Sequence, residues 1–503
     1  MDENTNKINI SHTKNLNKLN FNVTLNIPID TNSNIKTILN ISSYMFDSKV
    51  ECGNGKAIIT GKIGVKVLYI DTDNIPSTIT DSTNFSETIV DPTLSINSNL
   101  NISNYNILND ILSTDGTLKI NCEATILPIS YLNLGISNNL NNTEMLITKK
   151  DSFNTCTISN FVNTQFSYSS NLETKDEITK ILYTDSVFTA EKVIANNNYF
   201  VVEGKICNSI IYETQKDGDT VLKELKDISN VKSDIEANGL SLEDCLDLTF
   251  VLDKSLNNAN LEKEDSSNVI SLEHTIKVCG AILSRVTIDF VDDAFSTLHE
   301  IETTHTKRDC IKNVENLTLS EVVSNEIILQ KEDTAIDETI ANTYNNAEIT
   351  NYYLKDNNIF FEGVITSTLS YIDENKEFKS KTLQAPFVVK TKIEATKIDC
   401  INANINIIDN KVKVKRGTII EIEYSIYLSI TLYEKETYEM IDNYTLGKQL
   451  SYKDYDYQIF IAKPNETIWQ LCKRIKISPD NLTKCNKDLP LICVGGEKVI
   501  IKR

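Results

Sequence analysis

Hydrophobic and polar residues alternate along most of this 503-residue chain, which is the pattern of strands with one buried face. Residues 118–124 and 420–426 are clear examples, and β-branched residues are frequent throughout. Short helices are predicted only at residues 33–39, at residues 177–182 and around residues 241–247. The pattern therefore predicts a mainly β protein, in which antiparallel sheets pack face to face or against a short helix.

Three of the predicted strands share a glycine that precedes a tyrosine by eight residues. The pairs are Gly61 and Tyr69, Gly204 and Tyr212, and Gly363 and Tyr371. Because eight is even, both residues of a pair point to the same strand face, which is apolar between them. A glycine inside a long strand usually marks a β-bulge or the close approach of another backbone. Each copy is therefore predicted to be a bent, half-buried strand that ends in an anchoring tyrosine.

A second marker, an Asp-x-aromatic sequence followed by polar residues, recurs at Asp151, Asp293 and Asp442. It follows the three glycines by 90, 89 and 79 residues, so the two markers together indicate a repeat of domain size. Asp, Asn, Ser and Thr side chains bond back to nearby backbone groups. The marker is therefore predicted to be a turn or an exit segment at the end of a domain.

Residues 456–503 follow a different pattern, which reads strand, helix, turn, helix and strand. Thr467 precedes an apolar run at helical spacing and is predicted to be the N-cap of the first helix. Ser478 and Pro479 are predicted to begin the second helix, and Asn486 to end it. The tail is therefore predicted to be a small α+β module with the order βααβ.

The repeat and the tail together predict the domain plan of the chain. Three tandem β-rich domains, sandwich-like and with short helices, are predicted at residues 1–155, 156–300 and 301–436. A linker is predicted at residues 437–455, because no apolar period is sustained near its end. The α+β module then occupies residues 456–503.

The net charge of the chain bears on which classes of partner it could bind. The formal net charge is −20, and an acidic body repels phosphate backbones, so nucleic acid is not expected as a partner. From Tyr457 onward, nine basic and four acidic residues give +5. This basic module could meet an acidic partner, dock on its own acidic body or be an ordinary solvated surface. The start of the chain lacks the features of a signal peptide, and no apolar run is long enough to span a membrane.

The residues that commonly carry chemistry are scattered. The eleven cysteines are odd in number and contain no Cys-x-x-Cys pair, a pattern of reduced thiols rather than of disulfides or zinc ligands. The four histidines lie in unrelated contexts, and no phosphate loop, Gly-x-Ser-x-Gly or His-Glu-x-x-His motif occurs. We therefore predict no metal site, no cofactor, no catalytic residue and no enzymatic activity.

The tail resembles a LysM module, a βααβ unit known for binding polymers of N-acetylglucosamine. Residues 465–467, Asn-Glu-Thr, stand where LysM modules usually carry Gly-Asp-Thr, and Asn486 matches the Asn of that family. By this resemblance, the loops around residues 463–468 and 487–492 would form a shallow groove for acetamido sugars.

A tandem β-rich body followed by such a module resembles the spore-coat morphogenetic proteins of endospore-forming bacteria. Their repeated unit is called the SPOCS domain, and the clostridial SipL type has a similar plan. The resemblance implies a non-enzymatic scaffold for coat assembly in the mother-cell cytoplasm, at the forespore surface. Its LysM module would dock to the morphogenetic ATPase of the coat basement layer. The alternative is a protein that binds peptidoglycan or another N-acetylglucosamine polymer.

The module contains the candidate residues for binding a partner or a glycan. They are Asn465, Glu466, Thr467, Trp469, Lys473, Arg474, Asn486, Asp488, Leu489 and Pro490. Trp469 lies toward the edge of the buried face of the first helix, so it is either a core residue or an exposed anchor for a partner. Lys473 and Arg474 lie on or near the polar face, where they could meet an acidic partner or be solvated.

Overall fold

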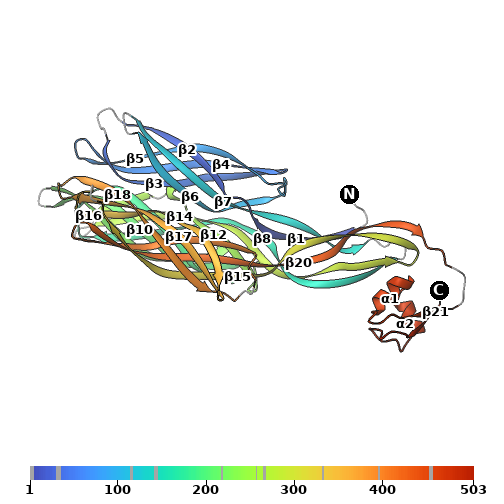
Figure 1. The fold of residues 1–503 in the computed structure, drawn as a ribbon. Coiled ribbons are helices and arrows are strands. Elements are labelled where there is room, and N and C mark those ends of the chain that lie inside the picture. The colour runs from blue at the N-terminus through green and yellow to red at the C-terminus, as the bar shows by residue number, and fades with distance from the viewer. Residues whose placement is uncertain are drawn as a thin grey trace.

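The computed structural model shows a mainly β protein, as the alternation predicts (Figure 1). It describes residues 5–29, 35–113, 117–140, 146–216, 219–256, 258–263, 268–330, 333–394, 397–452 and 457–502. The helices in these ranges are α1 (Ile468–Ile475), α2 (Pro479–Cys485) and one 3-10 turn at Lys254–Leu256.

The three short helices predicted for the body are wrong. Residues 35–39 and 178–182 belong to strands, and residues 241–244 form a turn that leads into another strand. Helices this short are unstable without tertiary packing, and the β-branched residues here pair with neighbouring strands instead. Residues 33 and 34 of the first predicted helix lie outside the described residues.

The body contains three successive sets of strands. The first set is β1 (Thr5–Asn15), β2 (Leu19–Pro28), β3 (Ile35–Gly53), β4 (Lys56–Asp71), β5 (Pro76–Val90), β6 (Asn99–Ser113) and β7 (Thr117–Leu140). The second set is β8 (Leu146–Thr174), β9 (Ile178–Asn196), β10 (Tyr199–Lys216), β11 (Asp219–Glu236), β12 (Cys245–Leu252), β13 (Asn258–Lys263) and β14 (Asn268–Ser296). The third set is β15 (His299–Ile328), β16 (Ile336–Lys355), β17 (Asn358–Asp373), β18 (Phe378–Lys392), β19 (Cys400–Lys415) and β20 (Ile419–Gln449).

Each set pairs its strands in the same way. The middle strands form a three-stranded antiparallel sheet, centred on β4, β10 or β17. The last strand, β7, β14 or β20, pairs with the first strand of its set and with the strand or strands before it. Apolar residues from both groups of strands share one hydrophobic core in each set, so the packing within a set is that of a β-sandwich.

The glycine–tyrosine stretches form β4, β10 and β17, and a β-bulge lies opposite each glycine, in the strand that precedes it. The register of the preceding strand shifts opposite each glycine: at Asp47 and Ser48 for Gly61, at Glu191 for Gly204 and at Thr350 for Gly363. The three tyrosines at the far ends of the stretches are buried, as predicted. The recurring bulge bends each three-stranded sheet at the same place.

Gly204 has no space for a side chain. A Cβ atom there would lie 2.3 Å from the carbonyl oxygen of Thr189 in β9. We therefore expect Gly204→Ala to lower the free energy of unfolding by about 1–3 kcal/mol, because β9 must shift. Gly53→Ala is the matched control, since its Cβ would have its nearest neighbour at an ordinary 3.7 Å. Urea unfolding measures both variants, and equal losses would contradict the expectation.

Three β-ribbons project from the sandwiches and pack together, and we call this part the stalk (Figure 1). The ribbons are β1 with the second half of β7, and the paired outer parts of β8 with β14 and of β15 with β20. All three ribbons contribute to one core, made of Ile10, Ile136, Phe153, Ile288, Phe290, Cys310 and Met440. Phe153 also stacks on Tyr438 of β20, with ring centroids 4.0 Å apart. The stalk is therefore a packed unit rather than three separate hairpins.

The Asp-x-aromatic markers lie in the stalk strands, so the prediction of turns at these positions is wrong. Asp151 lies in β8, Asp293 in β14 and Asp442 in β20. The aromatic residue two positions further on is buried in each case. The strands continue through the markers because tertiary packing buries these aromatic side chains: Phe153 and Tyr444 lie between the ribbons, and Phe295 packs against the C-terminal module.

Strands also continue through some of the domain and linker boundaries that the sequence predicts. β8 runs through residues 155 and 156, where the first domain boundary is predicted, whereas β15 begins at His299, next to the second. β20 runs to Gln449 and so includes residues 437–449 of the predicted linker. Polar residues on the outer parts of these strands hide the alternation that a buried sheet face would show.

Candidate functional site

The C-terminal residues form a small module beside the end of the stalk (Figure 1). β21 (Gln458–Ile461) pairs antiparallel with β22 (Lys498–Ile501), and the two helices lie between them in the chain. Leu471, Leu482 and Val499 are fully buried in its core. The order of its elements is the one predicted for the tail.

The helix starts in the module are confirmed. The Thr467 hydroxyl accepts from the backbone N–H of Gln470 at 3.2 Å, and the Gln470 side chain accepts from the Thr467 N–H at 2.9 Å. This reciprocal pair is a capping box. Ser478 caps α2, and Pro479 occupies its first turn. Thr467 thus stabilises the fold of the module, in addition to any role in binding.

Asn486 also holds the module together. Its carboxamide donates to the carbonyl oxygens of Leu482 at 2.8 Å and of Ile500 at 2.6 Å, and it accepts from the N–H of Ile500 at 2.8 Å. These bonds end α2, as predicted, and tie the helix to β22. The side chain is therefore occupied within the module.

Glu466 and Arg474 form an ion pair inside the module. Arg474 donates from Nε and Nη2 to the two carboxylate oxygens of Glu466 at 2.7 and 2.8 Å. These hydrogen bonds outweigh the effect of burial and lower the pKa of Glu466, which is only 7% exposed. Arg474 is thus paired within the module, rather than directed toward an acidic partner.

The two loops predicted to form a groove lie side by side. The N–H of Asn465 donates to the carbonyl oxygen of Cys493 at 2.8 Å, and the N–H of Cys493 donates to that of Glu466 at 2.9 Å. Asn465 has a φ of 59°, in the left-handed region. Asn tolerates this conformation better than most residues, which explains how it can stand where LysM modules usually carry Gly.

Trp469 and Lys473 contact the stalk. The indole Nε1 of Trp469 donates to Oδ2 of Asp293 at 2.7 Å, and Lys473 Nζ donates to Oδ1 of the same carboxylate at 2.5 Å. The Trp469 ring also meets the ring of Phe295 nearly edge-on, with centroids 5.1 Å apart. Phe295 is fully buried in the hydrophobic core of the module. Trp469 is therefore an anchor, and the surface that it anchors to belongs to the same chain.

This contact is expected to weaken in acid. Burial alone would raise the pKa of Asp293, but the hydrogen bonds from Lys473 and Trp469 outweigh it and lower that pKa. A carboxyl whose pKa is lowered in the docked state stabilises that state at pH values above the pKa of a free Asp. That contribution is lost as the pH falls through the lowered value, below about pH 4.

The fluorescence of Trp469, the single tryptophan of the chain, measures this transition as a function of pH. Asp293→Asn removes the titrating group, so the acid step in Trp469 emission should be absent from this variant. A step of equal size in both proteins would show that another carboxyl controls docking.

The other candidate residues are more accessible. Asn465, Asp488 and Pro490 are exposed, and Leu489 is half-buried against the module core. These four candidates therefore keep surface for a partner in the docked arrangement, as does Arg474, which is exposed although its guanidinium pairs with Glu466. Lys473 also keeps part of its side chain in solvent, although its amine is paired with Asp293.

Sequence reasoning missed three exposed apolar residues that follow Pro490. Leu491, Ile492 and Val494 expose 83%, 59% and 82% of their surface, and we call them the apolar loop. The N–H of Ile468 donates to the Leu491 carbonyl oxygen at 3.1 Å, so the apolar loop lies beside the start of α1. The run of apolar residues before Gly495, without a helix or strand period, is the signal that could have identified it.

The described residues contain no group of three His, Cys, Asp or Glu side chains placed to hold a metal ion. In the same ranges, no helix is long and apolar enough to cross a membrane. The cysteines in the described structure are all unpaired thiols. The chain matches no protein-family model, no curated protein and no solved structure.

Proposed function

We propose that this chain is a non-enzymatic scaffold for spore-coat assembly, in which three SPOCS-like domains carry a LysM module. The proposal rests on the resemblance of the whole layout and is supported by the three equivalent strand sets and the βααβ order of the module. The module docks to the morphogenetic ATPase of the coat basement layer, at the forespore surface in the mother cell.

The exposed apolar loop is the observation that favours protein docking. Leu491 and Val494 expose over four-fifths of their surface, and such apolar groups form the centres of protein interfaces. Trp469 and Lys473 are held by Asp293 in this arrangement, so the partner binds through the apolar loop and the neighbouring Pro490.

A binding measurement with the purified ATPase tests the proposal. Leu491→Asp combined with Val494→Asp is expected to weaken binding to the full chain by at least about a hundredfold, as for loss of an interface hot spot. Leu242→Asp is the matched control, because Leu242 is 65% exposed on the body. Equal affinity of the double variant and the wild-type chain would refute docking through the apolar loop.

The loops around residues 463–468 and 487–492, which the resemblance gives as a sugar groove, favour a second function, the binding of peptidoglycan. Their mutual backbone hydrogen bonds hold the two loops in one arrangement, and small-molecule sites are usually pre-formed. Retention of the full chain on insoluble peptidoglycan, reversed by chitooligosaccharide, would favour this function. Failure to bind peptidoglycan together with tight binding of the ATPase would favour the scaffold.

A further inference from the structure

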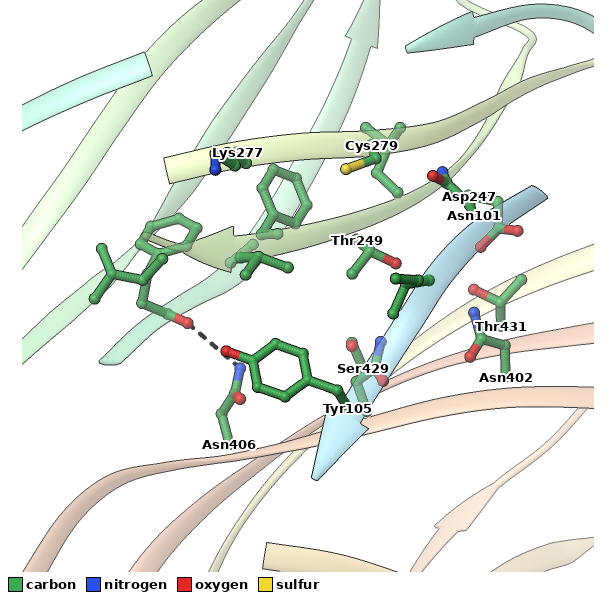
Figure 2. Close-up of a pocket in the computed structure, with 18 of the residues that line it drawn as sticks. Asn101, Tyr105, Asp247, Thr249, Lys277, Cys279, Asn402, Asn406, Ser429 and Thr431 are labelled. Carbon is green, nitrogen blue, oxygen red and sulfur yellow. Dashed lines mark hydrogen bonds between the residues drawn. The ribbon is translucent and has the colours of Figure 1, made fainter. Parts of the chain in front are cut away.

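A cavity of about 1230 Å³ lies between the three strand sets (Figure 2). The first set contributes β3 and β6, the second β9, β12 and β14, and the third β15, β16, β19 and β20. In Figure 2, Thr249 and Lys277 lie on one side of the hollow, and Tyr105, Asn406 and Ser429 on the other. This volume is larger than that of most small-molecule pockets, which is about 300–1,000 Å³.

Several edge strands of the sheets line the cavity, among them β6, β12 and β19. In the described structure β6 pairs only with β7, β12 only with β14, and β19 only with β20. Each edge strand therefore has one side whose backbone groups are not used by a neighbouring strand. Proteins normally cover or blunt such edges, because they are templates for pairing with another chain.

β12 presents the longest continuous edge to the cavity, because every residue from Cys245 to Leu252 lines it. The N–H of Asp253 donates to the Thr275 carbonyl oxygen of β14, so the backbone of Asp253 faces β14. Since the direction alternates along an antiparallel strand, the N–H and C=O groups of Leu248 and Phe250 point to the open side. The Leu246 carbonyl lies on this side too, where it accepts from Asn316 Nδ2 at 3.0 Å.

The β3 bulge lies at the mouth of the cavity. Asp47, Ser48 and Lys49 are both exposed and part of the lining, as is Lys192 of β9. Asp47 has a φ of 52°, and the register of β3 and β4 shifts at this point. Because these lining residues are exposed, the cavity is accessible from solvent beside the β3 bulge and Lys192.

The faces of β12 define which side chains an added strand would carry. Leu246, Leu248 and Phe250 pack toward the core of the second set, whereas Asp247 lies on the opposite face and accepts a hydrogen bond from the Tyr433 hydroxyl. A strand that continues this sheet would need apolar residues on the first face and polar residues on the second.

Two ion pairs lie at the end of β12. Lys277 lies 2.6 Å from Asp253, and Lys254 lies 2.6 Å from Asp185. A charged side chain brought in by a ligand would have to displace one of these partners or remain unpaired at a cost. The end of β12 therefore favours an uncharged occupant.

We propose that an extended, uncharged segment of a partner polypeptide, with apolar side chains at alternate positions, pairs with the open edge of β12 inside this cavity. Main-chain hydrogen bonds to Leu248 and Phe250 supply the affinity, and the alternating faces of β12 supply the side-chain preference. This site lies in the body and is separate from the apolar loop of the module.

The test uses the full chain and a fluorescent heptapeptide of alternating Thr and Val with blocked ends. We expect saturable binding with a Kd below about 1 mM, measured by fluorescence anisotropy. Leu248→Pro removes one N–H from the open edge and leaves the ladder with β14 intact, so it should weaken binding at least about tenfold. Leu248→Ala keeps that N–H and is the matched control.

A second measurement needs no variant. The same peptide with all its amide nitrogens methylated cannot donate main-chain hydrogen bonds and should not bind the wild-type chain. Equal binding of the methylated peptide would overturn the proposal, as would the absence of saturable binding up to about 1 mM. A Leu248→Pro protein with a wild-type thermal transition and wild-type affinity would overturn it as well.

Discussion

Phe295→Ala is expected to release the C-terminal module from the stalk. Phe295 extends from β14 into the module core, where it is fully buried and contacts Trp469. Removing a buried Phe side chain costs about 3–5 kcal/mol, and here the loss falls on the contact between stalk and module. Trp469 should then lose its apolar contact and its hydrogen bond to Asp293, so its emission should shift to the red.

Quenching of Trp469 by acrylamide measures the release directly, since the chain has a single tryptophan. Asp293→Ala should increase quenching in the same direction, because it removes the acceptor for Trp469 and Lys473. Asp292→Ala is the matched control, because the Asp292 carboxylate is next to Asp293 in the chain but pairs with Lys149. If Phe295→Ala left the emission and quenching of Trp469 unchanged, the docked arrangement would be refuted.

Phe153→Ala is expected to destabilise the stalk by a similar amount, about 3–5 kcal/mol. Phe153 lies where the three ribbons meet, stacked on Tyr438 and in edge contact with Phe290 at 5.6 Å. Its removal leaves a cavity that β-ribbons paired over their whole length cannot easily close. Hydrogen exchange should therefore speed up in the outer parts of β8, β14 and β20.

Phe161→Ala on the same strand is the matched control for Phe153. Phe161 is 40% exposed, so its replacement by Ala should lower the free energy of unfolding by only about 1 kcal/mol, mainly through the lost contact with Tyr131. Urea unfolding compares the two variants. A loss for Phe161→Ala as large as that for Phe153→Ala would indicate that the stalk has no central core.

The two predictions are connected through the position of the module. The stalk fixes Asp293 and Phe295, and these two residues hold the face of α1 that carries Trp469 and Lys473. The apolar loop is left exposed in this arrangement. A stable stalk would therefore present the apolar loop to a partner in one orientation, which reduces the entropy lost on binding.

Local features of the chain could be predicted from sequence because short-range preferences create them. Thr467 caps a helix through a bond to a residue three positions away, and Gly204 sits where a strand must bulge. Each depends on a short-range preference of the backbone. The binding role of Trp469 could not be resolved in this way, because its partner Asp293 is 176 residues away in the chain.

The alternation of apolar and polar residues was sufficient to predict strands, their buried faces and the βααβ order of the tail. It did not reveal that the last strand of each set pairs with the first, nor that three such ribbons unite in a stalk. Periodicity reports which face of a strand is buried, but every strand with an apolar face has the same pattern whichever partner covers it. The choice of a partner strand depends on long-range packing. The tertiary structure alone therefore decided the stalk, the docking of the module on Asp293 and the open edge of β12.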